Sequence, residues 1–171
     1  WDDTNDDSYD LTGDATGWGL HLSSNLKIAK KHVARLSVVY GEGIQNYMND
    51  ATADIGVVPN PGNPVSPLKG VALPLLGIVA FLDHSWSDEW STSVGFSTFD
   101  MDNASGQRDD AFAAGRYALV NLLHYPAPNV MIGGELQYGY RENFNDGWSV
   151  DDFKVQFSFK YTFSHTLGGN S

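Results

Sequence analysis

The chain has 171 residues, 42% of them hydrophobic and 13% aromatic, with 18 glycines, no cysteine and a formal net charge of −11. This composition is too apolar and aromatic for a disordered acidic segment, so we expect one folded domain or a part of one. The lack of cysteine excludes disulfide bonds, thiolate catalysis and cysteine-ligated zinc. Because the balance is acidic and the longest basic run is Lys30-Lys31, the sequence predicts no nucleic-acid partner.

No apolar run approaches the roughly 20 residues that a membrane-spanning helix needs. The longest candidate runs from Val71 to Leu82 and contains Pro74. A helical membrane protein is therefore excluded, whereas a membrane β-barrel is not, because each of its strands needs only about 9–11 residues.

Alternation of apolar and polar side chains predicts seven β-strands and no convincing helix. In chain order the strand segments are Trp18–Ile28, Ala34–Tyr40, Leu73–His84, Trp90–Thr98, Gly115–Tyr125, Ile132–Arg141 and Phe153–Phe163. The last segment shows the pattern most clearly, since Phe157, Phe159 and Tyr161 alternate with Ser158 and Lys160. The third and fifth segments are apolar on both parities, so alternation does not fix which of their side chains share a face.

The connections between these segments alternate in length. The short ones are Ala29 to His32, His84 to Glu89 and Tyr125 to Asn129, and the long ones are Tyr47 to Gly70, Asp100 to Asp110 and Glu142 to Asp152. Short periplasmic turns and long external loops are typical of outer-membrane barrels. The sequence therefore favours an all-β fold, a transmembrane antiparallel β-barrel with apolar side chains facing lipid.

Aromatic residues of the apolar parity lie near the strand ends. They are Trp18, Tyr40 and Tyr140 at the long-loop end, and Trp90, Tyr125, Tyr161 and Phe163 at the short-turn end. Two such belts, separated by aliphatic residues, match the interfacial girdles of a membrane barrel. A soluble sandwich would instead bury its aromatic residues toward the middle of the strands.

This topology divides the chain into three parts. Residues 1–17 form an external loop segment, residues 18–163 carry the seven transmembrane strands, and residues 164–171 form a periplasmic C-terminal tail. Seven strands alone do not close, because open sheet edges in lipid leave backbone groups unsatisfied and bacterial single-chain barrels have even strand numbers. The chain also starts at Trp1 without a secretory signal. We therefore expect it to be the C-terminal part of a larger barrel.

Six of the ten Lys and Arg residues fall on the predicted lumen face, and only Glu135 clearly opposes them. The predicted pore-lining residues are Lys27, Arg35, Arg116, Glu135, Arg141, Lys154 and Lys160. Cationic side chains that line a pore favour anions. The alternative is that they pair with acids and carry no selectivity. Alternation does not fix the face of Arg116, because its strand is apolar on both parities.

Short motifs follow one another in order between Gly17 and Phe163. They are Tyr40-Gly41-Glu42-Gly43-Ile44, Asn46-Tyr47-Met48-Asn49-Asp50, Leu75-Leu76-Gly77-Ile78-Val79-Ala80-Phe81 with Asp83-His84, Tyr117-Ala118-Leu119, Asn121-Leu122-Leu123, Gly133-Gly134-Glu135-Leu136-Gln137, Arg141-Glu142-Asn143-Phe144 and Gln156-Phe157-Ser158-Phe159-Lys160-Tyr161. This ordered set resembles the DcaP-like trimeric porins of Gram-negative outer membranes. The resemblance implies a sixteen-stranded homotrimeric barrel that passes small anionic solutes such as dicarboxylates and contacts outer-membrane lipid and lipopolysaccharide.

The sequence gives little support to an enzyme or a metalloprotein. The five histidines show neither HExxH nor paired spacing, the aspartate-rich N-terminal segment lacks the glycine and glutamate of an EF-hand, and no GxSxG motif occurs. We predict no catalytic activity, no cofactor and no metal site. Two alternatives stay open: a small eight-stranded outer-membrane barrel acting as adhesin or enzyme, and a soluble sugar-binding β-sandwich. The need for detergent and the conductance in a bilayer would separate them.

Overall fold

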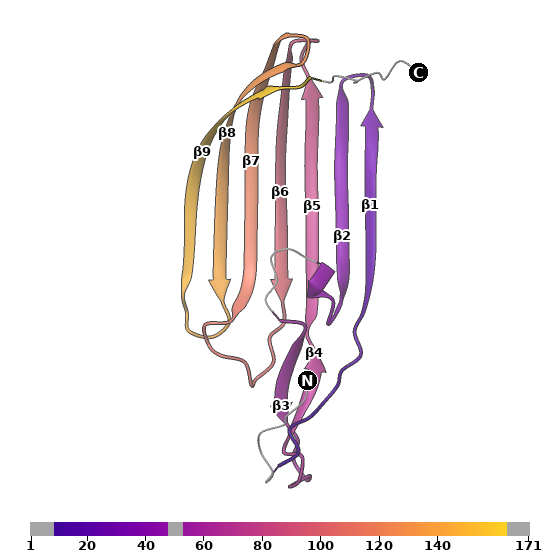
Figure 1. Cartoon of the computed structure of the whole chain (residues 1–171), viewed down its shortest axis with the longest axis vertical. Helices are drawn as coiled ribbons and strands as arrows, with labels where there is room; N and C mark the ends of the chain where they lie inside the picture. The colour runs from indigo at the N-terminus through magenta and orange to yellow at the C-terminus, as the bar shows by residue number, and fades with distance from the viewer. Residues whose placement is uncertain (1–8, 48–52, 164–171) are drawn as a thin grey trace, which may run out of the picture.

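The computed structural model describes residues 9–47 and 53–163, and strands dominate these ranges (Figure 1). The elements are β1 (Trp18–Ile28), β2 (His32–Glu42), the 3-10 helix η1 (Gln45–Tyr47), β3 (Ile55–Pro59), β4 (Leu68–Ala72), β5 (Pro74–Ser85), β6 (Trp90–Met101), β7 (Phe112–Ala127), β8 (Val130–Asn143) and β9 (Ser149–Tyr161). Seven of them form one antiparallel sheet in the order β1-β2-β5-β6-β7-β8-β9, which we call the main sheet, and β3 pairs with β4. The prediction of an all-β barrel fragment with seven main strands is confirmed.

Within the described ranges, no helix has the length and apolar character needed to cross a membrane.

Cross-strand pairing assigns every strand residue to one of two faces of the main sheet, because directly paired residues point the same way. The apolar face contains, for example, Leu22, Val38, Ile78, Phe96 and Phe157. On this face Leu22 is 74% exposed and Phe157 is 83% exposed, so no described segment covers them as the second layer of a sandwich would. This exposure is what strands facing lipid require.

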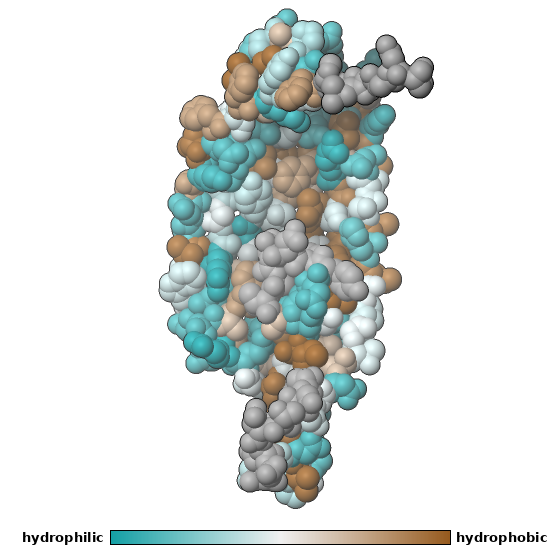
Figure 2. All heavy atoms as spheres, in the orientation of Figure 1, coloured by the Kyte–Doolittle hydropathy of each residue, from teal (hydrophilic) through white to brown (hydrophobic). Residues whose placement is uncertain are grey.

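The opposite, polar face carries the other parity of each strand, including Ser37 and Lys154. Figure 2 shows this face with hydrophilic residues along the strands. The three short turns gather at one end of the main sheet, which we call the short-turn end (Figure 1). The other connections, together with the β3–β4 hairpin, lie at the opposite, long-loop end. This arrangement agrees with the predicted alternation of connections.

Two connections differ from the prediction. The first long loop contains the β3–β4 hairpin, which the sequence did not predict. The predicted long loop Glu142 to Asp152 is only a turn over residues 144–148, because β8 continues to Asn143 and β9 begins at Ser149. In this turn, hydrogen bonds from the Asn143 amide and the Trp148 N–H hold the pKa of Asp146 below its usual range.

The aromatic residues of both predicted belts are exposed, except Tyr140, which is half-buried. At the long-loop end, the rings of Trp18 and Tyr40 meet edge to face with their centroids 5.8 Å apart. At the short-turn end, Tyr161 stacks on Phe163. Tyr125 departs from the belt, because its hydroxyl lies 3.3 Å from the Ser91 hydroxyl on the polar face and a register shift follows His124.

Buried apolar residues gather at the long-loop end of the polar face. The strands contribute Val39, Leu75, Phe99, Met101 and Phe112, and the loops contribute Leu73 and Ala104 with Ile44, Val58 and Val71 packed around them. This cluster therefore attaches the described parts of the two long loops, residues 53–73 and 102–111, to the polar face at the long-loop end. The Gly106 N–H adds a hydrogen bond of 3.1 Å to the Val57 carbonyl oxygen, which joins the second loop to β3.

The terminal parts of the predicted division lie partly outside the described residues. Of the predicted external segment 1–17, residues 9–17 are described, and the Asp10 N–H donates to the Val65 carbonyl oxygen in the connection between β3 and β4. This contact places the segment at the long-loop end, beside the hairpin. The predicted periplasmic tail, residues 164–171, lies outside the described residues.

Candidate functional site

Six of the seven predicted pore-lining residues share the polar face. Arg35 pairs with Asn25 and Phe81, and Lys154 pairs with Gln137, in one continuous row across the sheet. The same face carries Lys27, Glu135, Arg141 and Lys160. The sheet thus brings together, on one surface, side chains that are up to 133 residues apart in the sequence.

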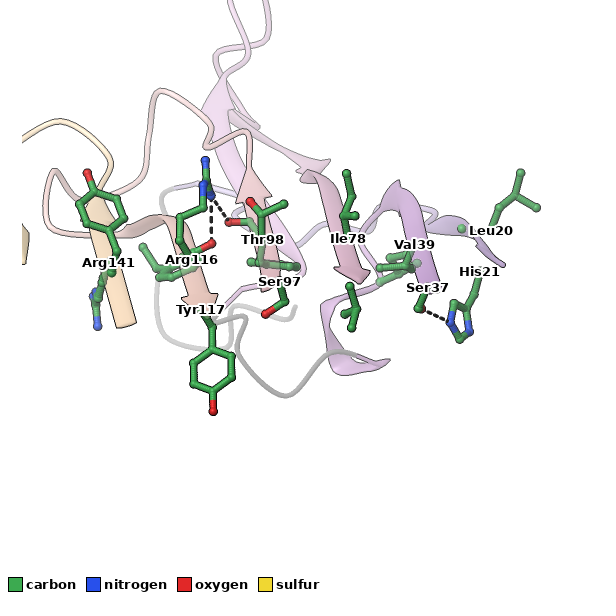
Figure 3. A pocket seen from close by; sticks show the side chains of 18 of the residues that line it. Leu20, His21, Ser37, Val39, Ile78, Ser97, Thr98, Arg116, Tyr117 and Arg141 are labelled. Carbon is green, nitrogen blue, oxygen red and sulfur yellow. Dashed lines mark hydrogen bonds between the residues drawn. The ribbon is translucent and has the colours of Figure 1, made fainter. Parts of the chain in front are cut away.

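Arg116 lies on the apolar face, contrary to the prediction. It pairs with Thr98 on β6 and with Tyr140 on β8, and Figure 3 shows it pointing away from Tyr117 and His21. Its guanidinium Nη2 lies 2.6 Å from Asp100 Oδ1, so this charge is partnered on the apolar face near the long-loop end. The physical reason for the error is that β7 is apolar on both parities, so alternation alone could not orient it.

The polar face also holds two acids that sequence reasoning did not assign to it. Asp83 pairs with Val33, and Asp152 pairs with Gly139. Asp83 escaped notice because β5 is apolar on both parities, and Asp152 because it was expected at the boundary of a loop. The polar face of the main sheet therefore carries five cationic residues and three acids, which is a smaller excess of positive charge than the sequence suggested.

A chain of polar contacts crosses the polar face near the short-turn end. Arg35 Nε donates to Asp83 Oδ2 at 2.7 Å, and the Ser93 hydroxyl donates to Asp83 Oδ1 at 2.7 Å. The Ser93 N–H then donates to Asn121 Oδ1 at 2.8 Å, and Asn121 Nδ2 lies 3.4 Å from Glu135 Oε2. Gln137 donates to the other Glu135 oxygen. Both acids of this network thus have partners, and the charge of Arg35 is neutralised by Asp83.

The remaining cations of the polar face have no such partner. Among the described residues, ion pairs within 4.0 Å join only Arg35 to Asp83, Arg108 to Asp110 and Arg116 to Asp100. No described carboxylate therefore lies within this distance of Lys27, Arg141, Lys154 and Lys160. We call these four residues the free cations.

A cavity of about 860 Å³ lies against the half of the sheet nearer the long-loop end (Figure 3). Its polar lining includes His21, Ser37, Ser97, Tyr117 and Arg141, and its apolar lining includes Val39, Phe99 and Phe112. His21 Nε2 lies 2.8 Å from the Ser37 hydroxyl oxygen. The Arg141 guanidinium carbon lies 5.7 Å from the centre of the Phe112 ring and 6.0 Å from that of Trp148, so aromatic faces hold this cation at the edge of the cavity.

Some apolar side chains on the polar face lie flat against the sheet. A Cβ atom built on Gly95 would fall 2.1 Å from a ring carbon of Phe81, its partner on β5. The glycine therefore gives the Phe81 ring room to lie across the neighbouring strand instead of projecting from it. An apolar residue can thus occupy this face while the space in front of the sheet stays open.

The fold has a counterpart of known structure. The chain is similar to the crystal structure of the outer membrane channel DcaP of Acinetobacter baumannii, with a TM-score of 0.75 and 17% sequence identity over 86% of this chain and 41% of that chain. This chain has an outer-membrane channel fold. The DcaP-like barrel that the sequence motifs predict is thereby confirmed at the level of fold, and the chain spans less than half of the solved channel. No family model and no curated protein matches the sequence.

Proposed function

We propose that this chain forms part of an outer-membrane channel through which small hydrophilic solutes diffuse passively, with a preference for anions such as dicarboxylates. The supporting observation is the division of the main sheet into two faces. Large apolar side chains are exposed on one face, whereas the other carries the free cations Lys27, Arg141, Lys154 and Lys160. A sheet of this kind closes around water with its apolar face in lipid.

The free cations are the basis of the proposed anion preference. Arg35 contributes less to it, because Asp83 neutralises its charge. Lys154 and Lys160 lie on β9, Arg141 on β8 and Lys27 on β1, so the unpaired positive charge is concentrated on the outer strands of the main sheet. A carboxylate solute moving along this face would pass positively charged side chains at several heights. These charges lower the energy barrier to permeation for anions relative to positively charged solutes.

The test is the reversal potential of the full-length protein in a planar bilayer under a salt gradient. Replacing Lys27, Arg141, Lys154 and Lys160 together by Gln is expected to shift the reversal potential toward cation preference, with the open channel retained. A matched variant replaces four cations outside the main-sheet strands, Lys30, Lys31, Lys69 and Arg108, and removes the same total charge. An equal shift in both variants would assign the selectivity to overall charge and contradict the role of the polar face.

The proposal includes location in a Gram-negative outer membrane, contact with lipopolysaccharide and assembly as a homotrimer. The exposed aromatic belts at both strand ends support a membrane setting, because such rings sit at lipid–water interfaces. Native mass spectrometry of detergent-solubilised protein tests the trimer directly. A protein that stays monomeric in several mild detergents and in lipid nanodiscs would contradict this part of the proposal.

A further inference from the structure

Two histidines face each other at the short-turn end of the apolar face. His32 is the first residue of β2, and His84 is its direct cross-strand partner near the end of β5. Their Nδ1 atoms are 3.1 Å apart, their ring centroids are 4.4 Å apart, and both side chains are partly buried. A neutral imidazole offers one donor and one acceptor nitrogen, so the two rings share a single proton between these atoms.

This spacing suits a metal ion as well as a proton. Imidazole nitrogens bind zinc at roughly 2.0–2.1 Å, so two such bonds to nitrogens 3.1 Å apart enclose an angle of about 100°. That value lies between the ideal square-planar and tetrahedral angles, and imidazole is a good ligand for zinc, copper and nickel. We propose that His32 and His84 bind a divalent transition-metal ion through their Nδ1 atoms, while the proton that they share moves by way of water to the Nε2 atom of the ring that held it.

Neighbouring residues hold His84 in position for this role. The Trp86 ring meets the His84 ring edge to face with centroids 4.3 Å apart. Trp86 is itself fixed, because its Nε1–H donates to the Thr92 hydroxyl oxygen at 2.9 Å and its carbonyl oxygen accepts a hydrogen bond from Lys31 Nζ. His84 is thus held between His32 and an anchored indole, which reduces the ordering that metal binding would require.

The site offers two protein ligands. No group of three or more His, Cys, Asp and Glu suited to a metal occurs in the part of the chain that the structure describes, so water or an anion from solution completes the coordination. Two imidazoles suffice for a saturable site, although a weaker one than the closed four-ligand sites of structural zinc. Its position beside the short turns leaves it within reach of water.

Another histidine at the same end provides a matched control. His124 stacks on Trp90 with ring centroids 4.2 Å apart, and its Nδ1 lies 3.3 Å from the Glu89 carbonyl oxygen. It therefore has a tryptophan beside it, as His84 does, but no described second imidazole paired with it. Changing His124 should leave the proposed site intact.

The test is a titration of the full-length protein in detergent with Cu²⁺, which quenches a nearby tryptophan, followed by displacement with Zn²⁺. We expect saturable quenching with one ion per chain. His32→Ala and His84→Ala should each weaken Cu²⁺ binding at least about tenfold, since changes even around a metal site cost that much. Trp86→Phe should remove most of the quenching, and His124→Ala should change neither the quenching nor the affinity.

Unchanged affinity in both His32→Ala and His84→Ala would overturn the proposal, and so would equal weakening by His124→Ala. His32→Gln and His84→Gln, which retain a polar side chain, guard against misfolding, and each variant is first checked for the heat-dependent gel migration of a folded barrel. A Gln variant that is folded and binds Cu²⁺ as tightly as the unchanged protein would also overturn it.

Discussion

On the apolar face of the main sheet, exposed apolar side chains such as Leu22, Phe96 and Phe157 follow the strands almost from end to end. The polar face changes along the same strands. Near the short-turn end it carries the hydrogen-bonded network around Asp83 and Glu135, and at the long-loop end it becomes an apolar core that binds the loops. One face is nearly uniform and the other is divided into zones.

The difference reflects what each face contacts. Lipid makes the same demand at every height of the hydrocarbon layer, so any large apolar side chain satisfies it. The polar face must hold charges, position loops and leave space open, and each of these tasks needs particular residues at particular heights. The effect of a substitution on the apolar face should therefore depend on the polarity of the new side chain. The effect of one on the polar face should depend on which contact is lost.

The largest effect is expected from a charge placed on the apolar face. Phe96 and Ser97 are neighbours near the middle of β6 that point to opposite faces. Phe96→Lys should destabilise the full-length protein by about 2–4 kcal/mol, the cost of a lysine near the bilayer midplane, whereas Ser97→Lys should be tolerated. Urea unfolding in lipid vesicles measures both. Equal losses would show that the two faces do not differ in their surroundings.

A smaller effect is expected where the second long loop docks on the hairpin. A Cβ atom on Gly106 would lie 2.1 Å from the Val57 carbonyl oxygen, so Gly106→Ala should push the loop away at a cost of about 1–3 kcal/mol. Limited proteolysis should then cut within residues 102–111. Gly139→Ala is the control, because no atom lies within 4 Å of its added Cβ. A loop that stays protected in Gly106→Ala would contradict the proposed docking.

The apolar face could be predicted from the sequence because it needs only an apolar side chain at every second position of a strand. Period-two alternation located seven strands, and the short turns fixed their antiparallel order. The β3–β4 hairpin was missed because its short strands Ile55–Pro59 and Leu68–Ala72 border a connection rich in proline, which reads as loop. Its pairing depends on packing against the apolar cluster, which a local pattern does not show.

The polar face could be predicted only in part, for a different reason. Lys27, Arg35, Arg141, Lys154 and Lys160 were found because their strands alternate clearly. Arg116 was assigned to the wrong face and Asp83 was assigned to neither, because β7 and β5 are apolar on both parities. Their faces follow from cross-strand partners, and the Arg35–Asp83 pair joins residues 48 positions apart. Charge balance on this face therefore depends on pairing that alternation does not encode.

Two ion pairs, one on each face of the main sheet, allow the contribution of the two faces to ion selectivity to be compared directly. Asp83→Asn releases the charge of Arg35 on the polar face, whereas Asp100→Asn releases that of Arg116 on the apolar face. Both pairs are partly exposed and lie near strand ends, where an unpaired charge costs less than at the bilayer midplane, so each change should cost no more than about 1 kcal/mol. Asp83→Asn should increase the anion preference of the reversal potential, and Asp100→Asn should leave it unchanged. A shift of the same size in both would remove the distinction between the faces.

The smallest effect is expected in the turn between β1 and β2. This turn sets the register of the two strands, and a slip of one residue would move the apolar side chains of one strand to the polar face. Ala29 in this turn has φ of 57°, a left-handed conformation that costs an ordinary L-residue about 1–2 kcal/mol. Ala29→Gly should therefore raise the free energy of unfolding by about 1 kcal/mol, less the greater chain entropy of glycine. Asn129 has φ of 65° in the turn before β8, and asparagine adopts this conformation more readily than alanine does. Asn129→Gly should therefore raise the free energy of unfolding by less than Ala29→Gly does. Unfolding in urea compares the two, and a larger gain at Asn129 would show that strain at Ala29 does not limit the turn.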